Sequence, residues 1–511
     1  MKIIINKIFG RIGFCALLII LQATILITAL IRFEQQFTYI YLVFLLLSFV
    51  SVMKIINNRL NPAYKLAWII PIMALPIFGG LFYFLFSSDQ TRKKFLKEMQ
   101  PINEQMKKYL PQDEQTIKDI EACDVRAANQ SHYINQYALC PVYEHTTSEY
   151  FPLGEKKFAR LLEKLKTAEH YIFLEYFIID PGIMWNAILD ILKEKAAAGI
   201  DVRIIYDDFG CLLLLPDNYQ KTLEAMGIKC CVFNPVVPFL NIRMNNRNHR
   251  KIVIIDGHTA FNGGVNIGDE YINAYDKYGH WKDTALMIQG EAVWSFTVMF
   301  LTMWNYLRKT DSSFEPFRPH VYHEAEFDND GFIQPFTDSP LDKEFVGETV
   351  YLNLISNAKN YILITTPYLI LDNEMINALS NAAKRGVDVR ILTPNKGDKW
   401  YVHAMTRANY RFLIEDGVKI YEYTPGFVHS KMFVVDDEYA VIGTINLDYR
   451  SLYLHYECAT WLYKTNTILE MKADINQALQ ISEEVTLAKY NETPLSYRLL
   501  FIFLRIFAPL M

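Results

Sequence analysis

The sequence contains two closely similar segments, His249-Arg-Lys-Ile-Val-Ile-Ile-Asp256 and His429-Ser-Lys-Met-Phe-Val-Val-Asp436. Both have the pattern His-x-Lys-x4-Asp around a run of β-branched and other apolar residues, which predicts a strand. The two copies begin 180 residues apart. A repeat of so long a period indicates two copies of one domain rather than a solenoid.

Segments before each motif repeat with nearly the same spacing. Residues 168–177 correspond to 358–367, residues 199–205 to 386–392 and residues 227–229 to 417–419, with offsets between 180 and 190. In each copy a helix that ends at a glycine is expected before an apolar strand; the helices span 185–199 and 374–386, and the strands 202–206 and 389–392. This alternation predicts an α/β fold with a largely parallel or mixed sheet in each copy.

The same three residue types carry the chemistry in each copy: His249, Lys251 and Asp256 in the first, and His429, Lys431 and Asp436 in the second. Side chains two positions apart on a strand share a face, so each histidine and its lysine point the same way. Each aspartate is seven positions from its histidine and faces the other side. We therefore expect the aspartates to support the strand end by hydrogen bonds or ion pairs.

Small and amide residues follow each strand. Gly264 and Asn266 follow the first motif, and Thr444 and Asn446 follow the second. We expect the glycine to allow close approach of the backbone to a phosphate. The asparagines are expected to face phosphate oxygens together with the lysines.

Two other interpretations, surface His-Lys pairs and a metal site, could explain a single copy of the motif. They do not explain two copies. Unrelated surface pairs on strands would not be followed by the same small-residue turn and asparagine at the same distance. A metal site would need more ligands than two histidines, and the lysine ammonium groups would repel a cation. We therefore expect no bound metal and no cofactor.

Two histidines that converge on one cleft suit exchange of a phosphodiester. One neutral imidazole attacks phosphorus and forms a phosphohistidine, and the other, protonated, gives its proton to the leaving alkoxide. The lysines stabilise the charge that grows on the phosphate oxygens. Because the two steps need opposite protonation states, the histidines are expected to titrate as a coupled pair.

Two acidic residues have two open interpretations. Asp283 lies 34 positions past His249, and Glu457 lies 28 positions past His429. Each would orient a catalytic imidazole, or each is an ordinary surface carboxylate.

The doubled motif resembles the signature of the phospholipase D superfamily, and the resemblance spans about residues 150–465. It implies two similar α/β sandwich lobes that form one active site, and a two-step reaction through a histidine-bound phosphoryl group. It also implies that His249 is the nucleophile and His429 the acid, a choice that the residues themselves do not make.

Further segments resemble bacterial cardiolipin synthases: Asn58-Arg-Leu-Asn-Pro62, His280-Trp-Lys-Asp-Thr284, Thr366-Pro-Tyr-Leu369 and Asp448-Tyr-Arg-Ser451. Thr444 stands where many relatives have serine, and it keeps the hydroxyl. The resemblance implies transfer of a phosphatidyl group between two phosphatidylglycerol molecules, which gives cardiolipin and glycerol. The alternative is another membrane phosphatidyltransferase or lipid hydrolase of the phospholipase D type.

The partners expected from this resemblance are phosphatidylglycerol and membrane lipid. The net charge of −5 over 511 residues gives no general attraction for a polyanion, so we expect no nucleic acid. We infer no obligatory protein partner. A catalytically silent membrane scaffold is a poor alternative because both motifs are intact.

The first 90 residues read as a membrane anchor. Apolar runs at about 12–31, 35–53 and 66–88 are each close to the ~20 residues that cross a bilayer. Basic residues before the first run and between the second and third place both segments in the cytosol. Pro71, Pro76 and Gly79–Gly80 suit either a third crossing or a re-entrant segment. We favour the re-entrant segment, a multi-pass protein of the cell membrane and a cytosolic catalytic region.

The predicted domain organisation follows from these features. The anchor is residues 1–90, a connector 91–150, the first lobe 151–335 and the second lobe 336–490. Residues 491–511 are mostly apolar with two arginines seven positions apart. They form either a helix in the lipid interface or a packed terminal helix.

Overall fold

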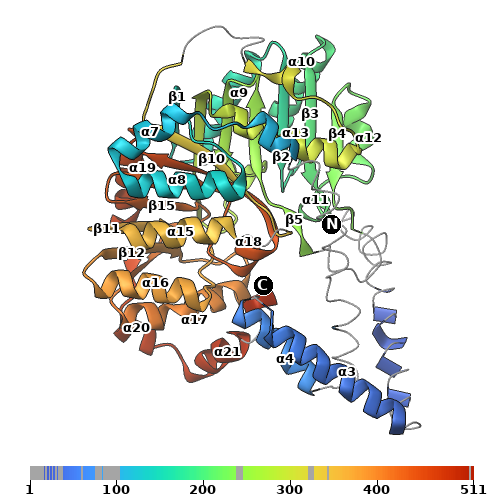
Figure 1. Cartoon of the computed structure of the whole chain (residues 1–511), viewed down its shortest axis with the longest axis vertical. Helices are drawn as coiled ribbons and strands as arrows, with labels where there is room; N and C mark the ends of the chain where they lie inside the picture. The colour runs from blue at the N-terminus through green and yellow to red at the C-terminus, as the bar shows by residue number, and fades with distance from the viewer. Residues whose placement is uncertain are drawn as a thin grey trace.

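Two mixed β-sheets with the same strand order form the centre of the molecule (Figure 1). The computed structural model describes residues 38–58, 61–74, 104–236, 245–319, 327–341, 344–505 and 508–510, together with isolated positions between 17 and 32 and Tyr83. The first sheet has the order β1-β9-β7-β6-β2-β3-β4. Its strands are β1 Thr146–Phe151, β2 Tyr171–Tyr176, β3 Asp201–Asp207, β4 Lys229–Phe233, β6 Lys251–Ile255, β7 Thr259–Gly263 and β9 Ala285–Gly290.

The second sheet repeats this order as β10-β17-β16-β15-β11-β12-β13, with β18 (Glu483–Glu484) added at one edge. Its strands are β10 Phe332–Asp338, β11 Tyr361–Thr365, β12 Asp388–Pro394, β13 Lys419–Tyr423, β15 Met432–Val435, β16 Tyr439–Gly443 and β17 His455–Tyr463. In each sheet three neighbouring strands are parallel and the motif strand is antiparallel to the first of them. The duplication and the mixed α/β sheets expected from the sequence are confirmed.

The alternation of side chains along the central strand β2 explains how its sheet is covered on both faces. Ile172 and Leu174 pack into a core with helices α9 (Gly154–Lys166) and α10 (Ile183–Ala197). Phe173 points to the other face, where its ring stacks on Phe300 of helix α13 (Val293–Arg308) at 4.6 Å. Residues 293–305 of α13 are all buried, and this helix shares one core with the second lobe.

Two short strand pairs join the lobes to each other. Strand β5 (Arg247–Asn248) of the first lobe pairs in parallel with β17 of the second. Strand β14 (Gly426–Val428) of the second lobe pairs in parallel with β8 (His280–Lys282) of the first. Each lobe therefore sends the segment just before its motif histidine to a partner strand in the other lobe.

The helices that were expected to end at glycines are present. Helix α10 ends two residues before Gly199, and α16 (Asn373–Lys384) ends two residues before Gly386. Both glycines have positive φ, +91° and +97°, a conformation that side chains with a Cβ rarely adopt.

The segment expected as a connector differs from the prediction. Strand β1 lies mostly within residues 91–150 and forms the edge of the first sheet by pairing with β9. Helices α7 (Glu114–Cys123) and α8 (Val125–Ala138) also lie there, and α8 packs on helix α15 (Val346–Asn357) and on β10 of the second lobe. Residues 332–335, assigned to the first lobe, belong to β10 of the second sheet. Strands β1 and β10 contain polar residues, so a search for apolar runs did not identify them.

Two helices represent the expected anchor within the described residues. Helix α3 (Thr38–Ile56) covers most of the second apolar run, and α4 (Pro62–Ala74) begins before the third and contains Pro71. They pack together through Ile55 and Ile72. In the part of the chain that the structure describes, no helix has the length and apolar character needed to cross a membrane. Most of the first run, Pro76, Gly79–Gly80 and residues 84–103 lie outside the described residues.

The C-terminal segment forms helix α21 (Leu495–Arg505), which packs on α17 (Trp400–Glu415). Phe501 and Leu504 are buried on this side. Leu495, Leu499 and Phe503 lie on the opposite side and are more than half exposed. One face of the helix is therefore packed, and the other presents an apolar stripe.

Candidate active site

Each motif histidine is held by a carboxylate from the other lobe. Nδ1 of His249 lies 2.9 and 3.0 Å from the two carboxylate oxygens of Glu457, and Nδ1 of His429 lies 2.6 Å from Asp283. Both acids are fully buried. Neither acid is therefore a surface carboxylate: each lies against a motif imidazole, and the pairing crosses between the lobes.

The exchanged strands create this crossing. The backbone N–H of His249 donates to the carbonyl of Tyr456 at 2.9 Å, and Tyr456 immediately precedes Glu457. The backbone N–H of His429 donates to the carbonyl of Lys282 at 2.7 Å, and Lys282 immediately precedes Asp283. The same main-chain register therefore places an acid beside each imidazole.

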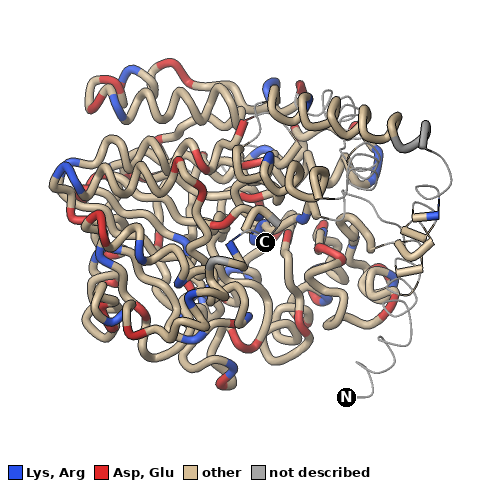
Figure 2. Tube along the Cα trace, turned by 90° about the horizontal axis from the view of Figure 1, so that it is seen from below, with Lys and Arg blue, Asp and Glu red and all other residues tan. Residues whose placement is uncertain are grey.

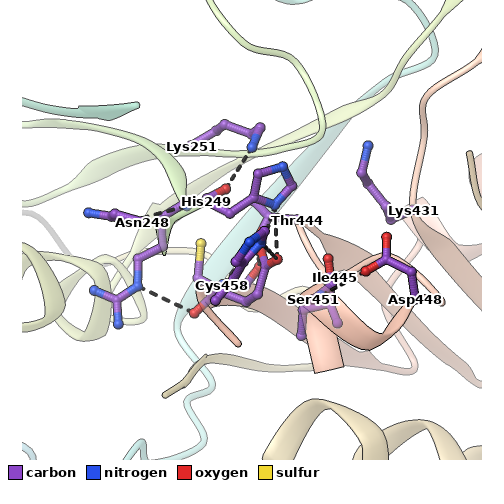
Figure 3. Close-up of polar contacts among 12 residues, drawn as sticks. Asn248, His249, Lys251, Lys431, Thr444, Ile445, Asp448, Ser451 and Cys458 are labelled. Carbon is purple, nitrogen blue, oxygen red and sulfur yellow. Dashed lines mark hydrogen bonds and ion pairs between the residues drawn. The ribbon is translucent and has the colours of Figure 1, made fainter. Parts of the chain in front are cut away.

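The two lysines lie on either side of His249 (Figure 3). Nζ of Lys251 donates to the carbonyl of His249 at 2.6 Å, and Nζ of Lys431 donates to the carbonyl of His429. Burial lowers the pKa of Lys251 to about 7 and that of Lys431 to about 8, and the charge of Lys431 further lowers the pKa of Lys251. The effect of Lys431 on Lys251, and that of Lys251 on His429, indicate that the two motifs lie close to each other.

The electrostatics favour neutral imidazoles in the free protein. Burial lowers the pKa of His249 to about 3 and that of His429 to about 4, although the neighbouring carboxylates oppose the shift. Burial would raise the pKa of Glu457, but the interactions with His249 outweigh it and hold that pKa low. A neutral His249 that donates from Nδ1 to ionised Glu457 leaves the lone pair of Nε2 for attack on an electrophile.

The motif aspartates support strand ends, as their spacing predicts. The carboxylate of Asp256 accepts from the backbone N–H groups of residues 169–171 at 2.7–2.8 Å, where β2 begins. Asp436 accepts from those of residues 359–361 at 2.6–2.9 Å, where β11 begins. Each aspartate therefore ties the end of the motif strand to the start of its neighbour.

Replacing Asp256 with alanine should destabilise the protein more than it affects chemistry. Three charge-assisted hydrogen bonds are lost, so we expect a loss of about 3 kcal/mol in the free energy of unfolding. Thermal unfolding measures this, with Asp217→Ala at an exposed position as the control. A variant that unfolds like the wild type but loses turnover would place Asp256 in the chemistry instead.

The structure shows a steric reason for the missing side chain at Gly264, and the expected approach to a phosphate stays a prediction. A Cβ at this position would lie 2.1 Å from an oxygen of Asp283 and 3.0 Å from the carbonyl oxygen of His429. The missing side chain therefore makes room for the acid and for the other lobe. At the corresponding position, the hydroxyl of Thr444 donates to Glu457, so this residue also acts on an orienting acid.

The two asparagines are placed differently. Asn266 accepts from the backbone N–H of Ile178 at 3.2 Å and donates to the hydroxyl of Tyr271 at 2.8 Å. Asn446 is buried, and its Oδ1 has no hydrogen-bond partner among the described residues. Asn266 is thus held by its own lobe, whereas Asn446 retains an unused polar group.

The comparison with known families agrees with this geometry. The model described as "Cardiolipin synthase, PLD-like domain" matches residues 161–304 and 351–479, which contain both motifs and both orienting acids. The chain belongs to this phospholipase D-like family. A second model, "Phospholipase_D-nuclease N-terminal", matches residues 46–87, which include α4 and part of α3.

Relatives in this phospholipase D-like family match nearly the whole chain. An uncharacterized protein of Streptococcus mutans is 42% identical over 461 residues, which cover 90% of this chain and 99% of the relative. A cardiolipin synthase of Geobacillus sp. (strain WCH70) is 35% identical and covers 91% and 92% of the two chains. The crystal structure of phosphatidylserine synthase from Haemophilus influenzae has the same fold, with a TM-score of 0.55, 15% identity and coverage of 75% and 98%.

Sequence reasoning missed several residues that complete the site of this family member. Arg250 donates to the carbonyl of Glu457 at 3.3 Å and lies 3.6 Å from buried Glu175, so it links the lobes behind His249. Lys157 is buried and donates to the hydroxyl of Tyr176 at 2.9 Å. Burial lowers the pKa of Lys157 to about 7 against the charge of Asp283. Charged residues at helical or strand spacing carry no signal of burial, so only the structure places them.

One group of donors within the described residues has the spacing of a metal site. Donor atoms of His249, His455 and Glu457 lie within 4.8 Å of one another. Glu457 is already engaged by His249, and the charge of Lys251 opposes added positive charge there by lowering the pKa of His249. The neighbouring lysine charge therefore disfavours a cation at these donors.

Proposed function

We propose that the chain transfers a phosphatidyl group from one phosphatidylglycerol to another and forms cardiolipin and glycerol. The observation that carries the proposal is the crossed pair of histidine–carboxylate dyads, in which a buried acid of each lobe holds the motif histidine of the other. Membership in the cardiolipin synthase, PLD-like family supports the choice of a phospholipid substrate. A relative named cardiolipin synthase at 35% identity supports the choice of product.

In the first step, Nε2 of His249 attacks the phosphorus of the donor lipid. The P–N bond forms, the P–O bond to the headgroup glycerol breaks, and protonated His429 gives its proton to that oxygen. The bound phosphate brings negative charge to a site whose basic groups have depressed pKa values. That charge favours proton uptake by His429, Lys251 and Lys431.

In the second step, the terminal hydroxyl of another phosphatidylglycerol attacks the same phosphorus. Neutral His429 takes the hydroxyl proton, the P–N bond breaks and His249 is regenerated. Lys251 and Lys431 neutralise the phosphate oxygens in both transition states. The side-chain amide of buried Asn446 would donate from Nδ2 to the same oxygens, while its Oδ1, an acceptor, has no partner among the described residues.

The proposal also includes the cellular location of the enzyme. The apolar N-terminal segments anchor the chain in the cell membrane, and the catalytic lobes lie on the cytosolic side. Both signs of charge are interspersed over the lobes (Figure 2), whereas α3 and α4 contain one lysine each and no acid. The exposed apolar stripe of α21 would rest in the lipid interface.

Product analysis with labelled phosphatidylglycerol tests the reaction. Cardiolipin with an equal amount of released glycerol is the expected result. Phosphatidic acid as the main product would assign the chain to the lipid hydrolases, and a different phosphodiester would indicate another acceptor.

Binding of the headgroup should weaken as the pH rises. Lys251 and Lys431 have pKa values lowered to about 7 and about 8, so the free enzyme loses positive charge through this range and regains it only when an anion binds. We expect the affinity for glycerophosphoglycerol to fall about tenfold or more from pH 6 to pH 9, with proton uptake on binding. Calorimetry in buffers of different ionisation enthalpy measures both. A constant affinity over this range would contradict the assignment.

Removal of divalent cations should leave the reaction unchanged. The charge stabilisation is assigned to lysines and imidazoles, so we expect the same turnover in the presence of EDTA, within about twofold. Restoration of lost activity by one particular divalent cation would instead implicate the donors His249, His455 and Glu457.

A further inference from the structure

The segment Asn58–Pro62 is a sequence motif that the catalytic site does not use. Asn61 stands directly before helix α4, and its Oδ1 accepts from the backbone N–H of Ala63 at 3.0 Å. Its Nδ2 points away from the helix and donates to Oδ2 of Asp372 at 2.9 Å and to the hydroxyl of Tyr453 at 3.0 Å. One amide therefore caps an anchor helix and also bonds to the second catalytic lobe.

The group that receives Asn61 is an unusual buried cluster of acids. The hydroxyl of Tyr453 also contacts Asp372 and Glu348, the latter at 2.7 Å, and all three side chains are buried. Burial, followed by the interactions with Asp372, raises the pKa of Glu348 to about 9. The buried carboxyl oxygens of this cluster need hydrogen-bond donors, and the amide of Asn61 supplies one to Oδ2 of Asp372.

Aromatic packing extends the same contact. The ring of Tyr64, on α4, meets the rings of Tyr449 and Tyr453 edge-on, with centroids 5.7 and 5.6 Å apart. Tyr449 and Tyr453 are the two ends of the short helix α18 (Tyr449–Tyr453). The C-terminal turn at residues 508–510 also packs against both α4 and α18. In Figure 1 the C-terminus accordingly lies beside α4.

Helix α18 lies between two parts of the catalytic site. Asn446 stands three residues before it, and Asp448 caps its start by accepting from the backbone N–H of Ser451 at 2.8 Å. Strand β17 begins two residues after it and carries Glu457, which holds His249. A contact on α18 can therefore affect the positions of both Asn446, which precedes the helix, and Glu457, which follows it.

We propose that Asn61 and Tyr64 dock the membrane anchor onto α18 and the Glu348–Asp372 pair, and so fix the orientation of the catalytic pocket toward lipid in the bilayer. Asn61 acts as a positioning residue, through Asp372 and Tyr453. This inference rests on the proposed lipid substrate. It adds that the anchor orients the catalytic lobes through specific contacts, besides holding them at the membrane.

The substitution Asn61→Asp tests the docking with little change elsewhere. Aspartate caps a helix as well as asparagine does, so α4 keeps its start. The new carboxylate cannot donate and faces Asp372 with like charge. Asn57→Asp is the matched control, since Asn57 is exposed in the same segment and its side-chain amide donates to the carbonyl of Met53 in its own helix.

The double variant Asn61→Asp with Asp372→Asn exchanges donor and acceptor. The asparagine introduced at position 372 can still cap α16 through its Oδ1, as Asp372 does for the N–H of Met375 at 2.9 Å. Its amide can donate to the carboxylate introduced at position 61. We therefore expect the double variant to recover what the single variant loses, which a general loss of stability would not do.

The experiment compares full-length variants on two forms of phosphatidylglycerol, long-chain lipid in vesicles and short-chain lipid dispersed in detergent. For Asn61→Asp we expect vesicle turnover to fall about tenfold, with dispersed-lipid turnover within about twofold of wild type. Hydrogen exchange at residues 449–453 should accelerate in this variant and return to the wild-type rate in the double variant.

Equal losses on both substrates, unchanged hydrogen exchange at α18, or failure of the double variant to recover would each overturn the docking. Absence of cardiolipin from the wild-type reaction would instead overturn the proposed function. In that case the exchange rates of α18 would still decide the docking.

Discussion

Replacing His249 with asparagine should lower turnover by about 10⁴-fold or more, because it removes the atom that is proposed to attack phosphorus. The asparagine amide can still donate to Glu457 from a position close to that of Nδ1, so the buried carboxylate is not left without a partner. Alanine would remove that hydrogen bond as well and mix a stability loss with the catalytic one. The measurement is turnover of labelled phosphatidylglycerol by protein whose thermal unfolding matches the wild type.

The same substitution at His429 should lower turnover to a similar extent, since both chemical steps need its proton. His132→Ala is the control, because His132 is exposed on α8, and we expect no change. A well-folded His249→Asn or His429→Asn variant that keeps near-normal turnover would remove that histidine from the mechanism.

Replacing Glu457 with glutamine should lower turnover by about 10³- to 10⁴-fold although the residue lies in the lobe opposite His249. The carboxylate accepts from Nδ1–H of His249, which fixes the tautomer with a free lone pair on Nε2. The glutamine amide can hydrogen-bond to Nδ1 whether or not Nδ1 carries the proton, so it does not fix the tautomer. It also carries no negative charge to stabilise an imidazolium. The expected loss is therefore in kcat, while KM changes little.

An exposed glutamate provides the control for this variant. Glu492→Gln changes the same functional group at an exposed position just after the second lobe and should leave kcat unchanged. If Glu457→Gln raised KM while kcat stayed normal, the acid would act on substrate binding, and the role given to the crossed pair would be wrong.

The sequence predicted the fold well where the signal was local. The apolar strands of the two motifs and the helices that end before Gly199 and Gly386 need only periodicity and turn chemistry. The supporting role expected for Asp256 and Asp436 agrees with their hydrogen bonds, although both lie just past their strands with positive φ, where strand parity does not apply. These elements repeat in both lobes, and each copy supported the interpretation of the other.

The pairing of each acid with the histidine of the other lobe could not be predicted from the sequence. Asp283 and Glu457 each follow the histidine of their own lobe along the chain, but each binds the histidine of the other. The crossing depends on β5 and β14, strands of two and three residues that carry no periodic pattern. Pairing between such short segments is decided by the packing of the lobes, and spacing along the chain does not encode it.

The role of Gly264 and the docking of Asn61 were missed for a related reason. A glycine after a strand suggests an approach to a ligand, yet here it admits Asp283 and the backbone of His429. Asn61 lies 311 positions before Asp372. A contact at that separation depends on how the chain folds back and leaves no trace in local composition.

The stereochemistry at phosphorus distinguishes a covalent histidine intermediate from a direct displacement. If His249 attacks and an acceptor hydroxyl then displaces it, the phosphorus undergoes two in-line displacements, each of which inverts its configuration. A donor lipid with a chiral, isotopically labelled phosphodiester should therefore give cardiolipin with retained configuration at the transferred phosphorus. Inversion would show a single direct displacement and would contradict a covalent histidine intermediate.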